Sequence, residues 1–357
     1  MSVYLGIEIG GTKLQLGIGT EHARLIDVCR LDIDPNGGAI GILRQIQRAG
    51  RDLIARHRPV HAGIGFGGPV DPAAGRVIRS HQIAGWKDHA LVDWCSQTLG
   101  LPASLGNDCD LAALAEARFG AGRGYGSLFF VTAGTGVGGG YVVDGRVQGA
   151  GRPAFAEIGH LRPGLQADRA DQTVESLASG WGIAAAARAE IQGDVSLRLD
   201  RAGESHPIDR NAGRMPPDRP DIELVFRRDL LERCGDDVER LTAKDVACAA
   251  SEGNQLAMNV LRRAAEVLGW AIAQMINLLA PEIVVIGGGV SLIGESLFFA
   301  PLRDAVSRYV FPPLAQTQRI VPAALGELVV VQGAIALAAQ QSADGDTILA
   351  MKGANAS

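Results

Sequence analysis

Apolar and polar residues alternate at the start of the chain, on both sides of a short run of glycines. The alternating apolar residues are Leu5, Ile7, Ile9, Leu14, Leu16 and Ile18. A period of two indicates β-strands, because successive side chains of a strand point to opposite faces. The pattern therefore predicts a β-hairpin whose turn is formed by Gly10, Gly11, Thr12 and Lys13.

The same order of elements recurs in the second half of the chain. A strand over 128–131 leads into a glycine-rich turn over 134–140, and a second strand follows over 141–143. Asp144 and Gly145 then form a hairpin turn before another short strand. We interpret the two strand–turn–strand units as a weak structural duplication, with the boundary between the halves near 121–124.

Other segments have the period of an α-helix or the continuous apolar character of a buried strand. Asp110 and Gly120 flank one of them, as the N-cap and the C-cap of a helix over 111–119. The other predicted helices cover 40–56, part of 86–99, 255–279 and 333–340, and the other predicted strands cover 62–66, 283–286 and 328–331. The tail beyond Ser342 is predicted to be loose.

Length and element order predict two α/β domains. At about 150 residues per domain, a chain of 357 residues is long enough for two. We expect an N-terminal domain over 1–121 and a C-terminal domain over 122–357, with the last helix packed back on the N-terminal domain. Residues 192–241 are charged and rich in proline, which predicts a surface insertion in the C-terminal domain, with a helix over 224–234.

The composition excludes several classes of protein. Hydrophobic residues make up 47% of the chain, enough to offset the entropy of folding, so general disorder is excluded. A net charge of −5 argues against a general nucleic-acid binder. The sequence has no uninterrupted apolar span of about 20 residues and no recognisable secretory signal. Its five cysteines stand singly, as in a reducing compartment, so we expect a cytoplasmic protein.

The glycine-rich segments favour a nucleotide-binding protein. Gly134, Gly136 and Gly139 match the glycine spacing of dinucleotide-binding folds, but a strand follows them where such a fold has a helix. The turn at Gly10 also lacks the spacing of a P-loop. What remains is two hairpin turns, each with a threonine, that would hold the β- and γ-phosphates of ATP if they faced each other across a cleft. Each turn by itself is more typical of a plain hairpin.

Several motifs, taken in order, resemble the ROK family. They are the segments 6–13, 107–108, 134–140, 157–160 and 286–291, together with Glu175. The resemblance runs from about Leu5 to Ala339, outside 192–241. The family comprises bacterial sugar kinases, including glucokinase-like enzymes, and related sugar-responsive repressors. The resemblance implies an α/β, two-domain actin-like ATPase (ribonuclease H-like) fold with a cleft between its domains, usually in a homodimer, and it implies ATP and Mg²⁺.

The resemblance also implies roles for polar residues in that cleft. Asp108 is expected to be the general base that accepts the proton of the attacking sugar hydroxyl. The residues expected to bind the sugar are Gly68, Asn107, Glu157, His160 and Glu175. Simpler interpretations stay open, in which Asp108 and Asp110 only cap a helix and His160 only caps a backbone carbonyl.

Phosphate and metal positions follow from the same resemblance. The residues expected along the nucleotide are Gly10, Gly11, Thr12, Lys13, Gly134, Thr135, Gly136, Gly287, Gly288 and Gly289. Glu8, where the family usually has aspartate, is expected to hold Mg²⁺ on the phosphates through water. Alternatively, Glu8 is an outward-facing strand residue, Lys13 is solvated, and 287–289 is a sharp turn between a strand and a helix.

One feature that is common in the family is missing. Members often carry three cysteines between the histidine and the second glutamate, which hold structural zinc together with that histidine. Here those positions are Gln166, Asp168 and Thr173. One histidine and one aspartate do not complete a tetrahedral site, so we expect no structural zinc. What orders this loop instead stays open.

These observations favour an ATP-dependent hexose kinase over two other classes. Glucose, phosphorylated at O6, is the default substrate, with fructose, mannose, allose or an N-acetylated hexosamine as alternatives. A sugar-responsive repressor needs a helix-turn-helix module, for which we find no room before the first hairpin. A silent sugar-binding protein would have lost the base or a phosphate turn, yet Asp108, Thr12 and Thr135 are all present. We therefore expect a sugar and ATP as partners, without nucleic acid or membrane.

Overall fold

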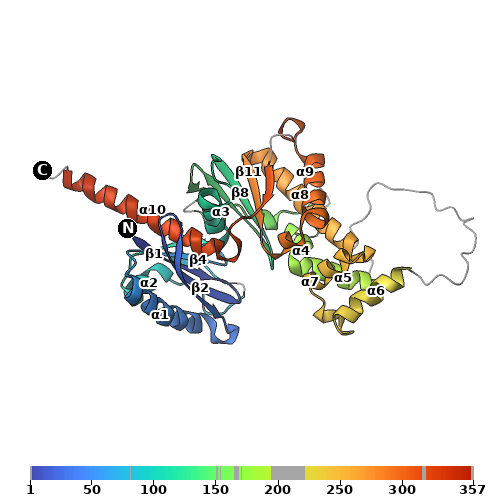
Figure 1. Ribbon diagram of the computed structural model, residues 1–357, viewed down its shortest axis with the longest axis horizontal. Coiled ribbons are helices and arrows are strands. Elements are labelled where there is room, and N and C mark those ends of the chain that lie inside the picture. Colours follow the sequence, from blue (N-terminus) through green and yellow to red (C-terminus); the bar gives the residue numbers. More distant parts are fainter. Residues whose placement is uncertain are drawn as a thin grey trace, which may run out of the picture.

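Two β-sheets lie side by side in the computed structural model, with helices around them (Figure 1). The structure describes residues 2–80, 82–149, 152, 154–164, 169, 171–193, 222–315 and 319–354. The strands of the first sheet are β1 (Val3–Ile9), β2 (Lys13–Thr20), β3 (Leu25–Asp32), β4 (Ala62–Phe66) and β7 (Ala103–Asn107). Those of the second sheet are β8 (Ser127–Ala133), β9 (Val137–Val143), β10 (Arg146–Val147), β11 (Ile283–Gly287) and β12 (Arg319–Pro322). A separate small pair is formed by β5 (Val70–Asp71) and β6 (Arg76–Val77).

The two sheets repeat one arrangement of strands. The first has the order β3-β2-β1-β4-β7 and the second has the order β10-β9-β8-β11-β12. In each sheet a hairpin, β1–β2 or β8–β9, is antiparallel, and the next two strands run parallel to the first strand of that hairpin. The structural duplication expected from the sequence is therefore confirmed by the topology.

The first hairpin forms as its apolar pattern predicts. Its alternating apolar side chains are buried, with Ile7 opposite Leu16 and Ile9 opposite Leu14 across the two strands. They form one hydrophobic cluster with residues of α1 (Gly38–His57) and α2 (Leu91–Leu99). In the second half, α8 (Gln255–Leu279) packs against α9 (Ala300–Tyr309) and shares a core with β8 and β11.

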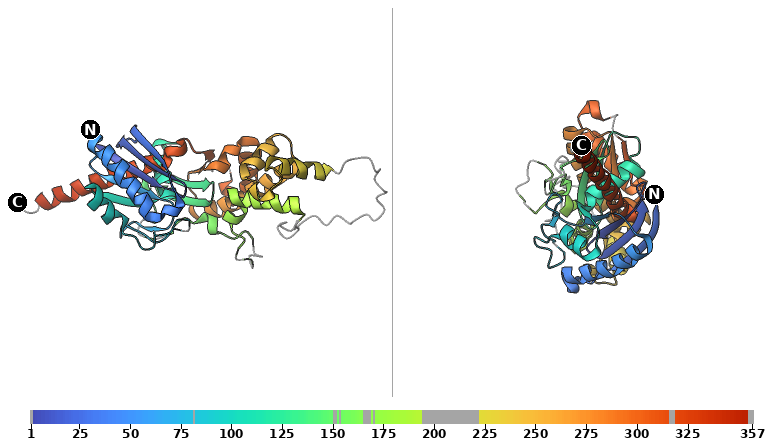
Figure 2. Two further views of the ribbon diagram at one scale, coloured as in Figure 1. Left: turned by 90° about the horizontal axis from the view of Figure 1, so that it is seen from below. Right: turned by 90° about the vertical axis from the view of Figure 1, so that its left-hand side faces the viewer.

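The other helices of the second half gather at the end of the molecule away from the first sheet (Figures 1 and 2). They are α4 (Val174–Ala178), α5 (Gly180–Gln192), α6 (Ile222–Arg233) and α7 (Ala243–Ser251). The short helical turns are η1 (Pro35–Gly37), η2 (Ile158–His160), η4 (Val238–Arg240), η5 (Gly289–Ile293), η6 (Glu295–Phe299), η7 (Pro312–Leu314) and η8 (Gly326–Leu328). Helix α6 confirms the helix expected over 224–234, while residues 194–221 of the expected insertion lie outside the described residues.

Two helices each follow a strand of one sheet and pack on the other sheet. Helix α3 (Asp108–Phe119) follows β7 but packs on β8 and β9, and α10 (Val329–Ala354) follows β12 but packs on β1, β2, β4 and β7. The two helices cross at Gly333, where any side chain would collide with the backbone of Leu111. Gly63 of β4 lets α10 approach in the same way, beside the carbonyl of Ala334. None of the helices in the described ranges has the combination of length and apolar character that a membrane crossing requires.

Some sequence predictions are wrong at the ends of elements. Residues 328–331 belong to η8 and α10 and not to a strand, because a helix that packs on sheet and helix is apolar all round and imitates a buried strand. The expected helix over 333–340 is part of α10, which continues to Ala354 through the tail that was expected to be loose. The sequence patterns also give no sign of the edge strands β3 and β12.

The second glycine-rich turn is shorter than the sequence indicates. Only 134–136 form the turn, and 138–140 lie within β9. Side chains added at Gly138 and Gly140 would collide with Cys109 of α3. These glycines therefore allow α3 to pack closely on the second sheet and are not part of a phosphate turn.

Candidate active site

The end of β7 and the start of α3 hold two of the expected site residues. Asn107 is the N-cap of the helix, and its Oδ1 accepts hydrogen bonds from the backbone N–H groups of Cys109 (2.8 Å) and Asp110 (3.4 Å). Its Nδ2 donates to the carbonyl of Gly68 at 3.1 Å. The expected cap at Asp110 is therefore wrong, because Asn107 already satisfies these N–H groups and the helix begins at Asp108.

Asp108 lies in the first turn of α3. Its Oδ1 accepts a hydrogen bond from the backbone N–H of Cys109 at 2.9 Å, which favours the ionised form. Burial acts in the opposite direction and is the larger effect, and the charge of Glu157 adds to it, so the pKa of Asp108 is raised to about 6. At neutral pH this carboxylate is ionised but more basic than an ordinary aspartate, as a general base should be.

Glu8 on β1 reaches the neighbourhood of Asp108. Burial is the main cause that raises the pKa of Glu8 to about 7, and the charge of Asp108 adds to it. Oε2 of Glu8 accepts a hydrogen bond from Nε2 of Gln15 at 2.9 Å. Gly67 lies close to both Asp108 and Ile9, since a methyl group there would lie 3.4 Å from Oδ2 of Asp108 and 3.4 Å from the carbonyl oxygen of Ile9. The carboxyl ends of β1, β4 and β7 thus meet at one place, where ligands of parallel sheets usually bind.

The first hairpin turn lies next to this group. The N–H of Gly10 donates to the carbonyl of Lys13 at 3.0 Å and closes the turn, and the carbonyl of Thr12 accepts from the N–H of Ile33 at 3.0 Å. Lys13 is exposed, with Nζ 3.6 Å from the carboxylate of Glu327. Its positive charge nevertheless lowers the pKa of Glu8, so the turn, Lys13 and Glu8 belong to one electrostatic environment.

The second hairpin turn is braced by Glu175 of α4. The N–H of Gly134 donates to the carbonyl of Gly136 at 2.9 Å, and Oε2 of Glu175 accepts from the N–H of Val137 at 2.9 Å. A methyl group at Gly134 would lie 3.6 Å from the backbone nitrogen of Gly289, so the glycines after β11 lie beside this turn. The structure therefore brings together 134–136, 287–289 and Glu175. Glu175, which the family resemblance assigned to the sugar, contacts the turn that the sequence analysis assigned to the phosphates of ATP.

Glu157 is the N-cap of η2, and His160 is the last residue of this turn. Nε2 of His160 is 3.9 Å from Oε2 of Glu157, and the two side chains are 69% and 39% exposed. Partial burial is the main cause that raises the pKa of Glu157, the charge of Glu175 adds to it, and His160 opposes it. Because Glu157 influences the pKa of Asp108 and is itself influenced by Glu175, the carboxylates form a continuous acidic group.

The loop that leads to Glu157 is strained. Ala154 and Ala156 have φ angles of +58° and +60°, where a residue with a side chain pays about 1–2 kcal/mol. Between them Phe155 packs over Gly149, where any side chain would collide with its ring. Such strain is typical of segments that present functional side chains.

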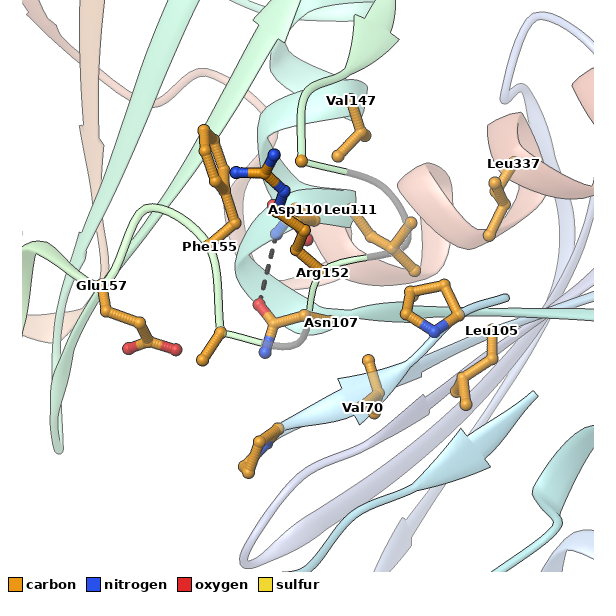
Figure 3. A pocket seen from close by; sticks show the side chains of 15 residues that line it. Val70, Leu105, Asn107, Asp110, Leu111, Val147, Arg152, Phe155, Glu157 and Leu337 are labelled. Carbon is orange, nitrogen blue, oxygen red and sulfur yellow. Dashed lines mark hydrogen bonds between the residues drawn. The ribbon is translucent and has the colours of Figure 1, made fainter. Parts of the chain in front are cut away.

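A pocket lies beside Asn107, and Figure 3 shows its lining. The lining includes Val70 and Leu105 of the first half, Phe155 of the second half and Leu337 of α10. Asn107 and Glu157 line this pocket, whereas His160, Glu175 and Asp108 do not. The pocket therefore adjoins the acidic group on one side.

Asp110 lines the same pocket, a position that the sequence pattern did not predict. Its Oδ1 is buried and has no hydrogen-bond partner among the residues that the structure describes. Burial, with the charges of Asp108 and Glu157, raises the pKa of Asp110 to about 7. The available sequence signal was spacing, because Asn107 and Asp110 are three residues apart and so share one face of the first helical turn.

The loop without zinc cysteines ends in an ordered cap. Thr173 is the N-cap of α4 and forms a capping box with Ser176. The other two positions, Gln166 and Asp168, lie outside the described residues. Within the described ranges, no three His, Cys, Asp or Glu side chains are grouped so as to hold a metal ion. The absence of structural zinc stays a prediction, which metal analysis of the purified protein tests.

Comparison with known proteins agrees with this arrangement. A model of the ROK family matches residues 4–341. The chain belongs to the ROK family. This ROK protein is 29% identical over 333 residues to a glucokinase of Halalkalibacterium halodurans, with 90% of this chain and 91% of the relative covered. It is also 29% identical over 316 residues to an N-acetylgalactosamine kinase of Shewanella sp., with 87% and 88% covered.

A solved structure extends the comparison to the fold. A ROK family glucokinase from Streptomyces griseus, in complex with glucose and AMPPNP, superposes on this ROK protein with a TM-score of 0.75 and 28% identity. The match covers 95% of this chain and 100% of that one. The two-domain actin-like ATPase fold that the sequence resemblance implied is therefore confirmed.

Proposed function

We propose that this ROK protein is a sugar kinase that transfers the γ-phosphoryl group of ATP to a hydroxyl group of a hexose, with O6 of glucose as the default acceptor. The observation that carries the proposal is the position of Asp108. Its carboxyl group has a pKa raised to about 6 and lies within electrostatic reach of Glu8 on one side and Glu157 on the other. A base is thus held between a candidate phosphate end and a candidate sugar end of one site.

At the sugar end, each polar residue has hydrogen-bonding capacity left for a hydroxyl group. Asn107 uses Oδ1 for the helix and one Nδ2–H for Gly68, so its second Nδ2–H is available to a sugar oxygen. Glu157 and His160 are exposed and accept or donate hydrogen bonds at the ring hydroxyls. Asp108 accepts the proton of the attacking sugar hydroxyl. The sugar oxygen bonds to the γ-phosphorus while the bond between that phosphorus and the oxygen that leaves with ADP breaks.

At the phosphate end, the two hairpin turns offer backbone N–H groups and threonine hydroxyls from opposite halves of the duplicated fold. The first turn, 10–12, adjoins Glu8, and the second, 134–136, adjoins the glycines 287–289. Backbone N–H groups at such turns bind anions without a charged side chain. Two of them, one from each sheet, hold a triphosphate in line with the acceptor.

The residues present suit Mg²⁺ bound with the nucleotide. Magnesium prefers oxygen ligands, keeps several waters and needs only one or two carboxylates beside the phosphates. Glu8 is a partly buried carboxylate, and its Oε1 has no hydrogen bond among the described residues. Glu8 would hold Mg²⁺ there through water, and the ion would supply positive charge to neutralise the phosphates.

A hexosamine with an N-acyl group is the second candidate substrate. The pocket beside Asn107 offers space next to the acidic group, walled by apolar side chains such as Val70 and Phe155. The unpartnered Oδ1 of Asp110 would accept a hydrogen bond from an amide N–H there.

An assay of ADP release with Mg²⁺-ATP over a panel of hexoses and N-acetylated hexosamines tests the proposal. We expect ADP release that depends on the sugar, with one acceptor favoured in kcat/KM, and with loss of the activity in EDTA. Sugar binding without sugar-dependent ADP release would instead support a regulator, and the proposal would be wrong. The homodimer stays a prediction, which light scattering during gel filtration tests.

A further inference from the structure

Three polar side chains form a row across the first sheet, from its edge strand toward Asp108. In the strand register, Gln15 of β2 stands opposite both Glu8 of β1 and Arg30 of β3. Nε2 of Gln15 donates to Oε2 of Glu8 at 2.9 Å, and Nε of Arg30 donates to Oε1 of Gln15 at 3.2 Å. The row ends at Glu8, whose pKa responds to the charge of Asp108.

Gln15, in the middle of the row, is buried, and its side-chain amide group donates two hydrogen bonds. Its side chain is 2% exposed, and Nε2 makes a second hydrogen bond to the carbonyl oxygen of Glu327 at 3.2 Å. The amide has only one workable orientation, since a flip would place its NH₂ group against the donor of Arg30 and its oxygen against two acceptors. An apolar residue would fill this position without the cost of burying an amide, so the contribution of Gln15 lies in the bonds it makes.

These bonds fix the carboxylate of Glu8. A glutamate has one more rotatable bond than the aspartate usual at this position, and it loses more conformational entropy when held in one place. The bond from Gln15 engages Oε2 and leaves Oε1 without a partner among the described residues. Gln15 on β2 thus sets the orientation of the Glu8 carboxylate, which adjoins the first hairpin turn.

The remaining bond of Gln15 reaches the chain segment that joins the two sheets. Glu327 lies in η8, within the stretch between β12 of the second sheet and α10. Lys13, two residues from Gln15, also lies 3.6 Å from the carboxylate of Glu327, although this pair is exposed and weak. Gln15 therefore touches Glu8 and the crossover between the sheets with one amide group.

We propose that Gln15 is a positioning residue for the phosphate end of the site. It holds Glu8 in the conformation that meets the Mg²⁺–nucleotide, and it anchors that conformation on the segment that connects the two sheets. This inference rests on the proposed function, because it takes Glu8 to act on the Mg²⁺-bound triphosphate. No contact of Gln15 with substrate is required.

The test is calorimetry of AMPPNP binding to the full chain, in Mg²⁺ and in EDTA, with glucose or the favoured hexose titrated separately. Gln15→Met keeps the approximate volume and removes both N–H donors, and Ile18→Val, in the same strand and fully buried, is the matched control. We expect Gln15→Met to weaken AMPPNP binding about tenfold in Mg²⁺, the loss expected for one hydrogen bond to a charged group. Binding in EDTA, hexose binding and all values for Ile18→Val should change less than twofold.

A double-variant cycle separates positioning from general damage. Because the shorter side chain of Glu8→Asp no longer reaches Gln15, adding Gln15→Met to it should weaken Mg²⁺-AMPPNP binding less than twofold further. Unchanged Mg²⁺-AMPPNP binding in Gln15→Met would overturn the inference, and so would equal losses in Mg²⁺, in EDTA and for the hexose. If the wild-type chain binds Mg²⁺-AMPPNP but phosphorylates no sugar, the proposed function fails and the binding comparison still decides the role of Gln15.

Discussion

At the scale of single residues, Asp108 combines two properties that oppose each other. The group must be ionised to accept a proton, yet its burial favours the neutral form and raises its pKa to about 6. We expect Asp108→Asn to lower kcat by about two to four orders of magnitude while hexose binding changes by less than about threefold. Steady-state kinetics with calorimetry of the hexose checks this, and a variant that keeps most of its turnover would remove Asp108 as the base.

The same substitution should stabilise the fold. A carboxyl group whose pKa is higher in the folded chain than in the unfolded chain costs stability above its unfolded pKa, and this cost is complete above the folded pKa. At pH 8, Asp108→Asn should therefore raise the free energy of unfolding, by at most about 3 kcal/mol, and at pH 4, close to the unfolded pKa of 3.8, the gain should fall below about 1 kcal/mol. Urea unfolding at the two pH values measures the difference, and a loss of stability at pH 8 would contradict the raised pKa.

The pH dependence of catalysis follows from the same group. Since only the ionised form of Asp108 accepts a proton, kcat/KM should fall as the pH drops through about 6. Glu8 and Asp110, with pKa values raised to about 7, carry charges that couple to Asp108, so the fall should be broader than that of one isolated group. A pH–rate profile in Mg²⁺-ATP checks this, and an acidic limb at pH 4 or below would contradict it.

Sequence reasoning could find some of these residues and not others. Asn107, Asp108 and Glu157 stand in short motifs, and in the structure Asn107 and Glu157 line one pocket while the charge of Glu157 raises the pKa of Asp108. The burial of Asp110 and the contacts of Gln15 and Glu175 depend on segments far apart in the chain, which no local pattern reveals. Their roles could be argued only after the strands and helices were placed.

At the scale of elements, apolar periodicity predicts strands and helices well where each packs on one side. The hairpin β1–β2 and the helix α8 agree with their patterns almost to the residue. The start of α10 does not, because contacts with the first sheet and α3 make it apolar on several sides and erase the helical period. The wrong strand over 328–331 has this cause.

The close approach of α10 to the first sheet gives a prediction for two glycines. A methyl group at Gly63 of β4 would collide with the backbone of Ala334, so Gly63→Ala should lower the free energy of unfolding by about 2–4 kcal/mol. Gly41 of α1 has open space around it, and Gly41→Ala should raise stability by about 0.5–1 kcal/mol through helix propensity. Chemical denaturation of both variants compares them, and a Gly63→Ala chain as stable as wild type would contradict the packing described for α10.

At the scale of the whole molecule, one buried carboxylate contacts both chain segments that connect the sheets. Oε2 of Glu116 accepts from the N–H of Ala121, on the way from α3 to β8. Oε1 accepts from the N–H groups of Ala324 and Leu325 at 2.9 Å each, on the way from β12 to α10. Glu116 is fully buried, so these charge-assisted bonds join the two crossovers in a setting that water does not screen.

Glu116→Gln should loosen this junction. The amide NH₂ group would face at least one backbone donor, and we expect a loss of about 2–4 kcal/mol in the free energy of unfolding. Glu282→Gln is the matched control, because Glu282 accepts a single hydrogen bond from Gly126 of the first crossover and is exposed, so its loss should stay below about 1 kcal/mol. Equal losses in the free energy of unfolding of the two variants would show that burial does not make the hydrogen bonds of Glu116 more stabilising than the one made by the exposed Glu282.

We propose that the two halves of the duplicated fold hold one triphosphate between their hairpin turns, with Asp108 beside the acceptor sugar. A crystal structure of the protein with Mg²⁺, AMPPNP and the hexose that the assay selects tests this most directly. We expect phosphate oxygens in contact with backbone N–H groups of both 10–12 and 134–136, and a sugar hydroxyl within hydrogen-bonding distance of Asp108. A triphosphate that contacts only one of the turns, or a sugar whose hydroxyls lie away from Asp108, would contradict it.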